Sequence, residues 1–168
     1  MYEKGTGVPQ DYAQAVKWYR LAADQGYASA QSNLGVMYAN GTGVPQDYAQ
    51  AMKWYRLAAD QGYASAQLNL GTMYALSQGV PQDDVQAVRW LRLAADQGNV
   101  KAQFTLGSMY ALGRGVPQDD VQAHKWLSLS AAQGDANFAK MRDLVAKRMT
   151  PQQIERAQEL ARNWKPKK

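Results

Sequence analysis

The sequence has no cysteine, a single histidine and no apolar run that approaches the roughly 18 to 20 residues needed to span a bilayer. Without cysteine there is neither a disulfide framework nor thiol chemistry, and this absence fits reducing and oxidising compartments equally. The lone His124 takes the register of Val16, Met52 and Val88 and has no nucleophile beside it, which predicts a structural role. Phosphate loops, metal-ligand spacings and nucleophile elbows are also missing. We therefore expect no catalysis, no cofactor and no metal site.

Two pairs of carboxylates, Asp83-Asp84 and Asp119-Asp120, are the remaining candidates for an ion site. The first aspartate of each pair stands where a helix N-cap is expected, and the second favours the positive N-terminal end of the same helix. Calcium binding at these pairs is the weaker alternative.

The net charge of +5 is concentrated at one end of the chain. Residues 1–139 carry ten Lys/Arg and eleven Asp/Glu, whereas residues 140–168 carry nine and three, a net of +6. The simpler interpretation is a solvated face on a terminal helix. The alternative is that nucleic acid or another acidic surface binds there, through the basic residues Lys140, Arg142, Lys147, Arg148, Arg156 and Arg162.

What the sequence does contain is a repeat. The segment that begins GVPQD appears four times, starting at Gly7, Gly43, Gly79 and Gly115, and each start lies 36 residues after the last. A fixed period of roughly 20 to 50 residues is typical of solenoids, in which each unit stacks on its neighbours.

Each repeat reads as two helices. Apolar residues in 28–40 recur at steps of three and four, and Gly41 to Gly43 end that helix. Asp47 is the predicted N-cap of the next helix, 48–61, with Gln50 as its capping-box partner. Glycines recur inside the first helices at positions 35, 71 and 107, which predicts close helix–helix approach. Ser77 departs from the pattern, because glycine stands there in neighbouring units.

The repeat resembles the Sel-like repeat, a subfamily of tetratricopeptide-type αα-repeats, over about residues 1–134. The positions that carry the resemblance are Ala30, Leu34-Gly35, Met37-Tyr38, Gly41, Gly43-Val44, Asp47, Ala51, Trp54-Tyr55, Ala58-Ala59 and Gly62. The fold that follows is all-α, a right-handed αα-superhelix (α/α solenoid) of tandem helix pairs with a C-terminal helical cap and about nine helices. The resemblance implies an adaptor or scaffold, with bacterial relatives, that binds a protein or peptide on a concave face lined by the first helix of each repeat.

Residues on that face that differ between copies, and amides that are kept, are the candidate partner-binding residues. They are Ser32, Asn33, Leu68, Asn69, Thr72, Lys101, Phe104 and Ser108. An Asn offers a donor and an acceptor to an extended peptide, Leu68 and Phe104 would form apolar pockets, and Lys101 could meet a carboxylate. The alternative is structural: Asn33 and Asn69 tie adjacent repeats together, and Leu68 and Phe104 fill gaps between them.

The two ends of the sequence differ from the repeats. Met1-Tyr2 aligns with the end of a first helix, so we expect a fragment or an incomplete first repeat, with the uncovered face near Trp18 available for a homo-oligomer. Residues 1–134 form the predicted repeat domain and 135–168 a cap, with helices over 136–148 and from Thr150 to Trp164 and a disordered 165–168 tail. A cell-envelope hydrolase is a further alternative. Periplasmic, secreted and cytoplasmic locations all fit.

Overall fold

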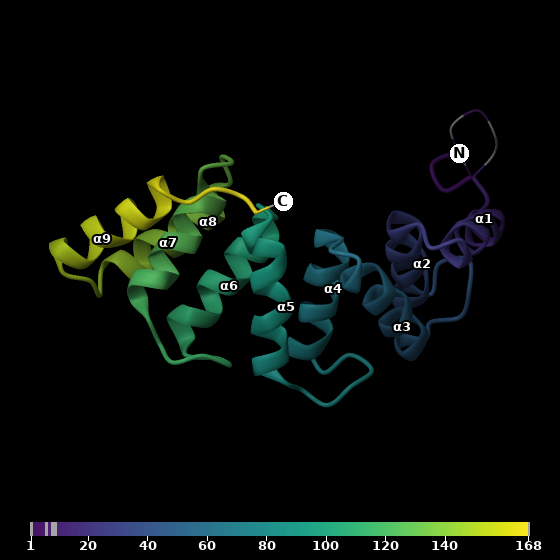
Figure 1. The fold of residues 1–168 in the computed structure, drawn as a ribbon, viewed down its shortest axis with the longest axis horizontal. Helices are drawn as coiled ribbons and strands as arrows, with labels where there is room; N and C mark the ends of the chain where they lie inside the picture. The colour runs from purple at the N-terminus through teal and green to yellow at the C-terminus, as the bar shows by residue number, and fades with distance from the viewer. Residues whose placement is uncertain (1, 6, 8–9, 168) are drawn as a thin grey trace. The chain divides into compact units, whose positions relative to one another are not determined.

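The computed structural model describes residues 2–5, 7 and 10–167, and over this part the chain forms nine α-helices and no strand (Figure 1). The chain divides into two compact units, Met1–Gln82 and Asp83–Lys168, described here one at a time. The first unit holds α1 (Tyr12–Asp24), α2 (Ala28–Asn40), α3 (Tyr48–Asp60) and α4 (Ala64–Ala75). The second holds α5 (Asp84–Asp96), α6 (Val100–Leu112), α7 (Asp120–Ala131), α8 (Ala136–Ala146) and α9 (Pro151–Arg162). The all-helical prediction is confirmed.

Aspartate side chains start the second helix of each repeat, as the sequence predicted. The Asp47 carboxylate accepts a hydrogen bond from the backbone N–H of Gln50 at 3.0 Å, which satisfies one of the free N–H groups in the first turn. Asp11, Asp83 and Asp119 cap α1, α5 and α7 in the same way. The prediction that Gln50 completes a capping box was wrong, because the Asp47 backbone N–H donates to the Tyr38 carbonyl at 2.9 Å. The last helix begins with a complete capping box between Thr150 and Gln153.

The residue that ends a first helix adopts a left-handed backbone conformation, which explains the glycine there. In one repeat a serine takes this position instead. Gly41 and Gly113 end α2 and α6 in the left-handed region, at φ 67° and 65°. Ser77, which replaces glycine after α4, is forced to φ 57°. A residue with a Cβ is strained there by roughly 1–2 kcal/mol, so the departure noted in the sequence carries a cost in stability.

Two other glycines allow backbones to approach closely. A Cβ on Gly35 in α2 would lie 2.6 Å from the ring of Tyr55 in α3, so these helices can pack together only without it. A Cβ on Gly43 would lie 2.5 Å from the carbonyl oxygen of Tyr12, at the start of α1. The predicted close approach at position 35 is confirmed, and the loop glycine has a packing role that the turn alone did not reveal.

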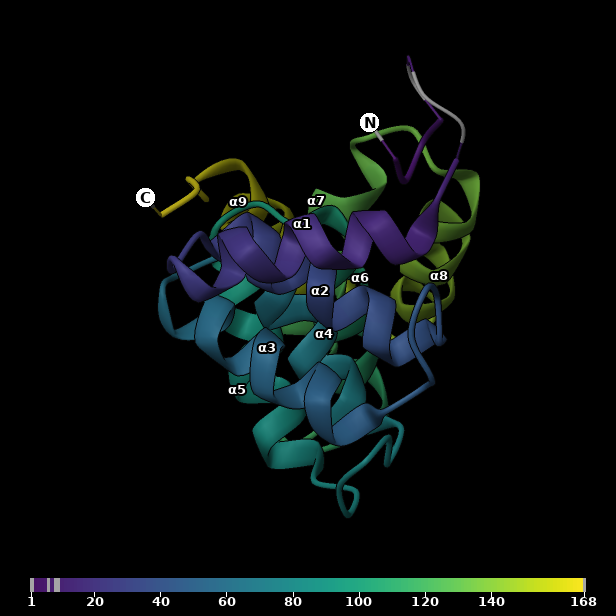
Figure 2. The same ribbon diagram turned by 90° about the vertical axis from the view of Figure 1, so that its right-hand side faces the viewer.

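The core of the first unit forms where α2 packs between α1 and α3 (Figure 2). Leu34 on α2 is fully buried in a cluster with Val16 and Ala23 of α1 and Trp54 of α3. Burial of this apolar surface is the main stabilising contribution, at roughly 25 cal/mol per Å².

In the second unit, α7 contacts α6, α8 and α9, and its Ala123 and Leu127 are buried with Val145 of α8 and Ala157 of α9. The segment after α9 also differs from prediction, because residues 165–167 are held in place rather than disordered. The Trp164 ring lies edge-on to Trp126, with centroids 6.3 Å apart. Beyond it, Lys167 donates from its backbone N–H and its Nζ to Asp96, at 2.8 and 2.7 Å. Lys168 lies outside the described residues.

Candidate functional site

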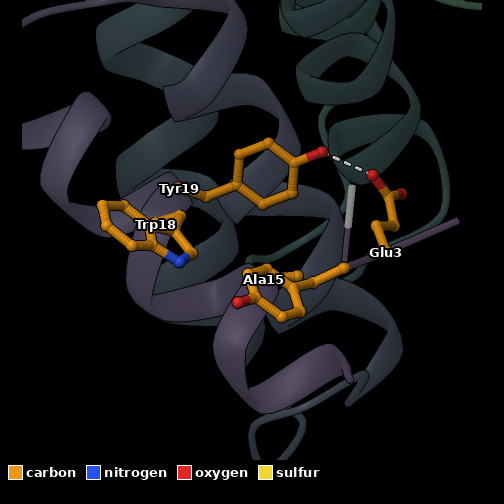
Figure 3. Close-up of a pocket in the computed structure, with 5 residues that line it drawn as sticks. Glu3, Ala15, Trp18 and Tyr19 are labelled. Atoms are coloured by element: carbon orange, nitrogen blue, oxygen red, sulfur yellow. Dashed lines mark hydrogen bonds between the residues drawn. The ribbon is translucent and has the colours of Figure 1, made fainter. Parts of the chain in front are cut away.

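A hollow of about 420 Å³ lies beside α1 at the start of the first unit. Tyr2, Glu3, Ala15, Trp18 and Tyr19 line it, and Figure 3 shows the Tyr19 hydroxyl donating to the Glu3 carboxylate. Burial raises the pKa of Tyr19 to about 12, and the Glu3 carboxylate adds to the effect. Because a phenol with a raised pKa stays protonated at neutral pH, Tyr19 acts here as a hydrogen-bond donor to the carboxylate.

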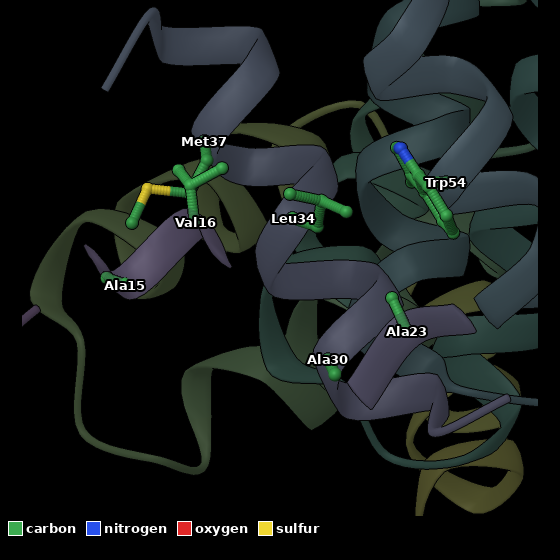
Figure 4. Packing of buried hydrophobic residues seen from close by; sticks show 7 residues of the cluster. All are labelled: Ala15, Val16, Ala23, Ala30, Leu34, Met37 and Trp54. Atoms are coloured by element: carbon green, nitrogen blue, oxygen red, sulfur yellow. The ribbon is translucent and has the colours of Figure 1, made fainter. Parts of the chain in front are cut away.

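The hollow contains a tryptophan whose counterpart in the next repeat is covered by neighbouring helices. Trp18 is 60% exposed, whereas Trp54, which occupies the same register 36 residues later, is only 8% exposed. Figure 4 shows why: side chains from α1 and α2, among them Ala23, Ala30 and Leu34, converge with Trp54. Among the described residues, no helix precedes α1 to cover Trp18 in this way. The surface therefore suits a further helix pair, and the predicted homo-oligomer through it stays a prediction.

Five of the eight predicted partner-binding residues belong to the first unit. Ser32 on α2 is only 3% exposed, so its side chain has no access to a partner in this structure. Asn33 is exposed, and its amide opposes the rise in the pKa of the Tyr19 hydroxyl. Its role, in partner binding or in tying repeats together, stays a prediction. On α4, Leu68, Asn69 and Thr72 are half-buried, and the Thr72 hydroxyl donates to the Leu68 carbonyl at 2.9 Å.

The other three lie on α6, next to an apolar groove. The α6–α8 groove has a volume of about 200 Å³ and is lined by Ser108, Ala111, Leu112, Met141, Leu144, Val145 and Arg148. Both helices occupy the first-helix position of their repeats, because α8 follows α7 as α6 follows α5. Leu112 and Leu144 on its two sides are 66% and 57% exposed. Each of the two helices that border the groove thus contributes one exposed leucine to its lining.

Phe104 lies one helical turn before Ser108 and stacks on Phe138 of α8, with ring centroids 4.4 Å apart and planes 24° from parallel. The Ser108 hydroxyl donates to the Phe104 carbonyl at 2.9 Å. Phe104 also packs against the core of the second unit. It therefore fills space between repeats and at the same time fixes the separation of α6 and α8, where the groove lies. Lys101, one further turn back, is exposed.

The basic residues around α8 divide into paired and exposed groups. Arg142 pairs with Asp143 at 2.8 Å, and Arg148 pairs with Asp120 at 2.6 Å while also donating to the Ala111 carbonyl. Lys140 and Lys147 are exposed, and no ion pair is recorded for them among the described residues. On α9, Arg156 and Arg162 line a shallow depression together with the acidic Glu155 and Glu159. The positive charge of this end is thus partly neutralised.

Groups that could perform chemistry are held in structural contacts. His124 is buried, and its Nδ1 lies 3.3 Å from the Ser128 hydroxyl, so the expectation that no nucleophile lies beside it was wrong: the serine one turn later on α7 shares its face. Burial lowers the pKa of His124, with Arg142 acting in the same direction. Asp84, one of the candidate calcium ligands, forms an ion pair with Arg114 at 2.7 Å. The described residues contain no cluster of three or more His, Cys, Asp or Glu side chains able to hold a metal ion. They also contain no helix with the length and apolar character needed to cross a bilayer.

Two sets of recurring polar contacts escaped the interpretation of the sequence. Buried glutamines on the first helices donate to backbone carbonyls of the preceding helix, at 3.1 to 3.2 Å from Gln31, Gln67 and Gln103. Arginines on the second helices donate to tyrosine hydroxyls 18 residues later, as in the 2.6 Å bond from Arg56 to Tyr74. The signal was present, since both residue types recur every 36 residues. An apolar periodicity, however, does not identify these residues, because their contacting groups are polar.

Comparisons with known proteins agree with the repeat. A model of the Sel1 repeat family matches residues 1–27, 28–63, 64–99 and 100–135. The structure is similar to c5321, a protective antigen of uropathogenic Escherichia coli strains with an SLR fold, at 37% identity and a TM-score of 0.89, over 97% of this chain and 35% of that one. It is similar to a Sel1 repeat protein from Oxalobacter formigenes at 35% identity and a TM-score of 0.80, over 98% and 70% of the two chains.

A more distant likeness is to Helicobacter pylori cysteine rich protein B, at 17% identity and a TM-score of 0.61 over 79% of this chain and 95% of that one, which concerns the fold alone. No curated protein matches the sequence. The chain spans about a third of the length of the Escherichia coli protein. The four consecutive matches and the two relatives above 30% identity establish that this chain is an all-α helical-repeat solenoid and belongs to the Sel1 repeat family.

Proposed function

We propose that this chain binds a protein or peptide partner on the surface of its first helices, and that the α6–α8 groove is a principal part of that surface. Sel1 repeat proteins generally act as protein-interaction modules. The observation that carries the proposal is the pair of exposed leucines, Leu112 and Leu144, on opposite sides of one groove. At about 200 Å³ the groove is smaller than the roughly 300–1,000 Å³ of small-molecule sites. It is suited to apolar anchors of a peptide.

In this proposal, residues on the first helices of the first unit also contact the partner. Asn33, Leu68, Asn69 and Thr72 lie on α2 and α4 and are exposed or half-buried. The amides of Asn33 and Asn69 suit contacts with a peptide backbone, and Leu68 offers an apolar contact. Ser32 is left out because its side chain is buried.

The Sel1 fold is generally a non-catalytic interaction fold, and we propose that this chain has no catalytic activity either. A hydrolase needs a nucleophile held by a base. The one histidine is buried against Ser128, four residues away on the same helix, rather than facing the hollow or the groove. For nucleic acid, two of the candidate cations are already engaged, because Arg142 pairs with Asp143 and Arg148 with Asp120. Protein or peptide is therefore the better-supported partner.

Selection from a displayed random peptide library on the purified protein tests this proposal. Peptides that are enriched should bind wild type and the control Leu93→Ser alike, because Leu93 is an exposed leucine of α5 outside the groove. Leu144→Ser and Leu112→Ser should each weaken binding by about tenfold or more, as expected when an apolar contact is lost. Enriched peptides that bind Leu144→Ser and Leu112→Ser as well as wild type would contradict the groove assignment, as would a library that yields no binder.

A further inference from the structure

The charges along the α6–α8 groove indicate what kind of peptide it accepts. On α8, Lys140 and Lys147 lie four residues before and three residues after Leu144, so all three share one face of the helix. On α6, Lys101 and Leu112 lie on one stripe, eleven residues apart, which is about three turns. On α8 the exposed leucine thus has a lysine about one turn away on either side, whereas on α6 the lysine lies about 16 Å along the helix from Leu112.

The acidic side chains next to the groove are already neutralised. Asp120 is paired with Arg148 and Asp143 with Arg142. Lys101, Lys140 and Lys147 are exposed, and no such pair is recorded for them among the described residues. The α8 edge of the groove is therefore positive, and it belongs to residues 140–168, whose net charge is +6 from nine basic and three acidic residues.

We propose that the occupant of the α6–α8 groove is an acidic amphipathic segment of a protein partner. Its apolar side chains contact Leu112 and Leu144, and its Asp or Glu side chains lie over Lys140 and Lys147. This inference rests on the proposed function and specifies the partner class. The apolar contacts supply affinity, while the exposed charges select an acidic sequence over a neutral or basic one.

The expected selectivity follows from the exposure of the two lysines. Exposed ion pairs contribute little individually, so two of them correspond to about a 2- to 30-fold preference for the acidic peptide at low salt. Raising the salt from about 0.1 M to about 1 M shortens the screening length from about 10 Å to about 3 Å and should reduce that preference.

The experiment uses three fluorescein-labelled short peptides with one leucine pattern, whose intervening residues are all Glu, all Gln or all Lys. Binding is measured by fluorescence anisotropy with wild type, Lys140→Glu/Lys147→Glu and the control Lys4→Glu/Lys17→Glu. The control changes the total charge equally but lies in the first unit. Wild type and control should prefer the Glu peptide, and the groove variant should lose that preference while retaining affinity for the Gln peptide.

Leu144→Ser distinguishes a failure of the acidic-partner proposal from a failure of the groove as the binding site. Glu and Gln peptides that bind wild type equally, and both lose affinity in Leu144→Ser, would overturn the acidic partner and leave the groove as the binding site. Peptides that bind Leu144→Ser as well as wild type would overturn both. A short single-stranded oligonucleotide that binds more tightly than the Glu peptide, and is lost in Lys140→Glu/Lys147→Glu, would show a nucleic-acid surface instead.

Discussion

Replacing Trp54 by alanine should destabilise the protein strongly, and the same replacement at Trp18 should not. The two tryptophans occupy one register of neighbouring repeats, yet Trp54 is 8% exposed and Trp18 is 60% exposed. Trp54 packs into the cluster that contains Ala30 and Leu34. Truncating a buried Trp costs about 3–5 kcal/mol, because apolar contacts are lost and a cavity remains. Exposed substitutions usually stay within about 0.5 kcal/mol.

Circular dichroism at a helical wavelength, during urea and thermal unfolding, measures the difference without relying on the fluorescence of the deleted side chain. For a chain of this size 1 kcal/mol corresponds to about 2–4 °C, so Trp54→Ala should lower Tm by on the order of 10 °C. Trp18→Ala serves as the matched control and should change Tm by only about 1–2 °C. If both variants shifted Tm equally, the packing assigned to Trp54 would be refuted.

Four further changes test separate parts of the account. Ser77→Gly should be more stable than Ser77→Ala by about 1 kcal/mol in urea unfolding, because both lose the 3.1 Å hydrogen bond from the Ser77 hydroxyl to the Val80 carbonyl but only glycine relieves the left-handed strain at φ 57°; equal stability of the two variants would contradict that strain. Gly115→Ala should cost more than Gly26→Ala, since both have positive φ but only the Cβ at Gly115 would collide with Asp84; equal Tm values would refute the collision. Burial lowers the pKa of His124, so the neutral imidazole contributes fully to the free energy of unfolding above a pH of about 6.5, and this contribution falls as the pH drops toward the folded pKa. His124→Val should flatten this part of the plot of unfolding free energy against pH. An unchanged plot would rule the histidine out as the source of the pH dependence. If the face around Trp18 mediates self-association, sedimentation should give a concentration-dependent mass that Trp18→Glu reduces to that of a monomer, and a wild type that is monomeric at every concentration would dismiss the idea.

The fold was predictable because the same helix-pair pattern occurs four times in the sequence. Each Asp before an amphipathic segment marks a helix start, and its repetition at a 36-residue step turns a weak local signal into a strong one. The inner glycine at position 35 was also interpreted correctly, since only close packing explains a helix-weakening residue kept at one register. The resulting boundaries agree with α2 and α3 to within one residue.

The site was harder to predict, because register identifies the helix but not what lies opposite each side chain. Ser32 shares its register with Leu68 and Phe104, yet its own side chain is 3% exposed. The Phe104–Phe138 stack depends on a residue beyond the last regular repeat, where the periodic pattern has ended. The tail was expected to be disordered because Lys and Pro dominate it, whereas Trp164 anchors it to Trp126. Long-range contacts of this kind have no local sequence signal.

The most direct test of the account is a map of amide chemical-shift changes when a peptide selected on wild-type protein is titrated into isotope-labelled protein. Binding at the groove predicts that the largest changes fall on α6 and α8, around Ser108, Leu112 and Leu144. It also predicts that they disappear in Leu144→Ser while the spectrum of the free variant stays folded. Changes confined to α9, or to α1 around Trp18, would contradict the assignment of the α6–α8 groove as the binding surface.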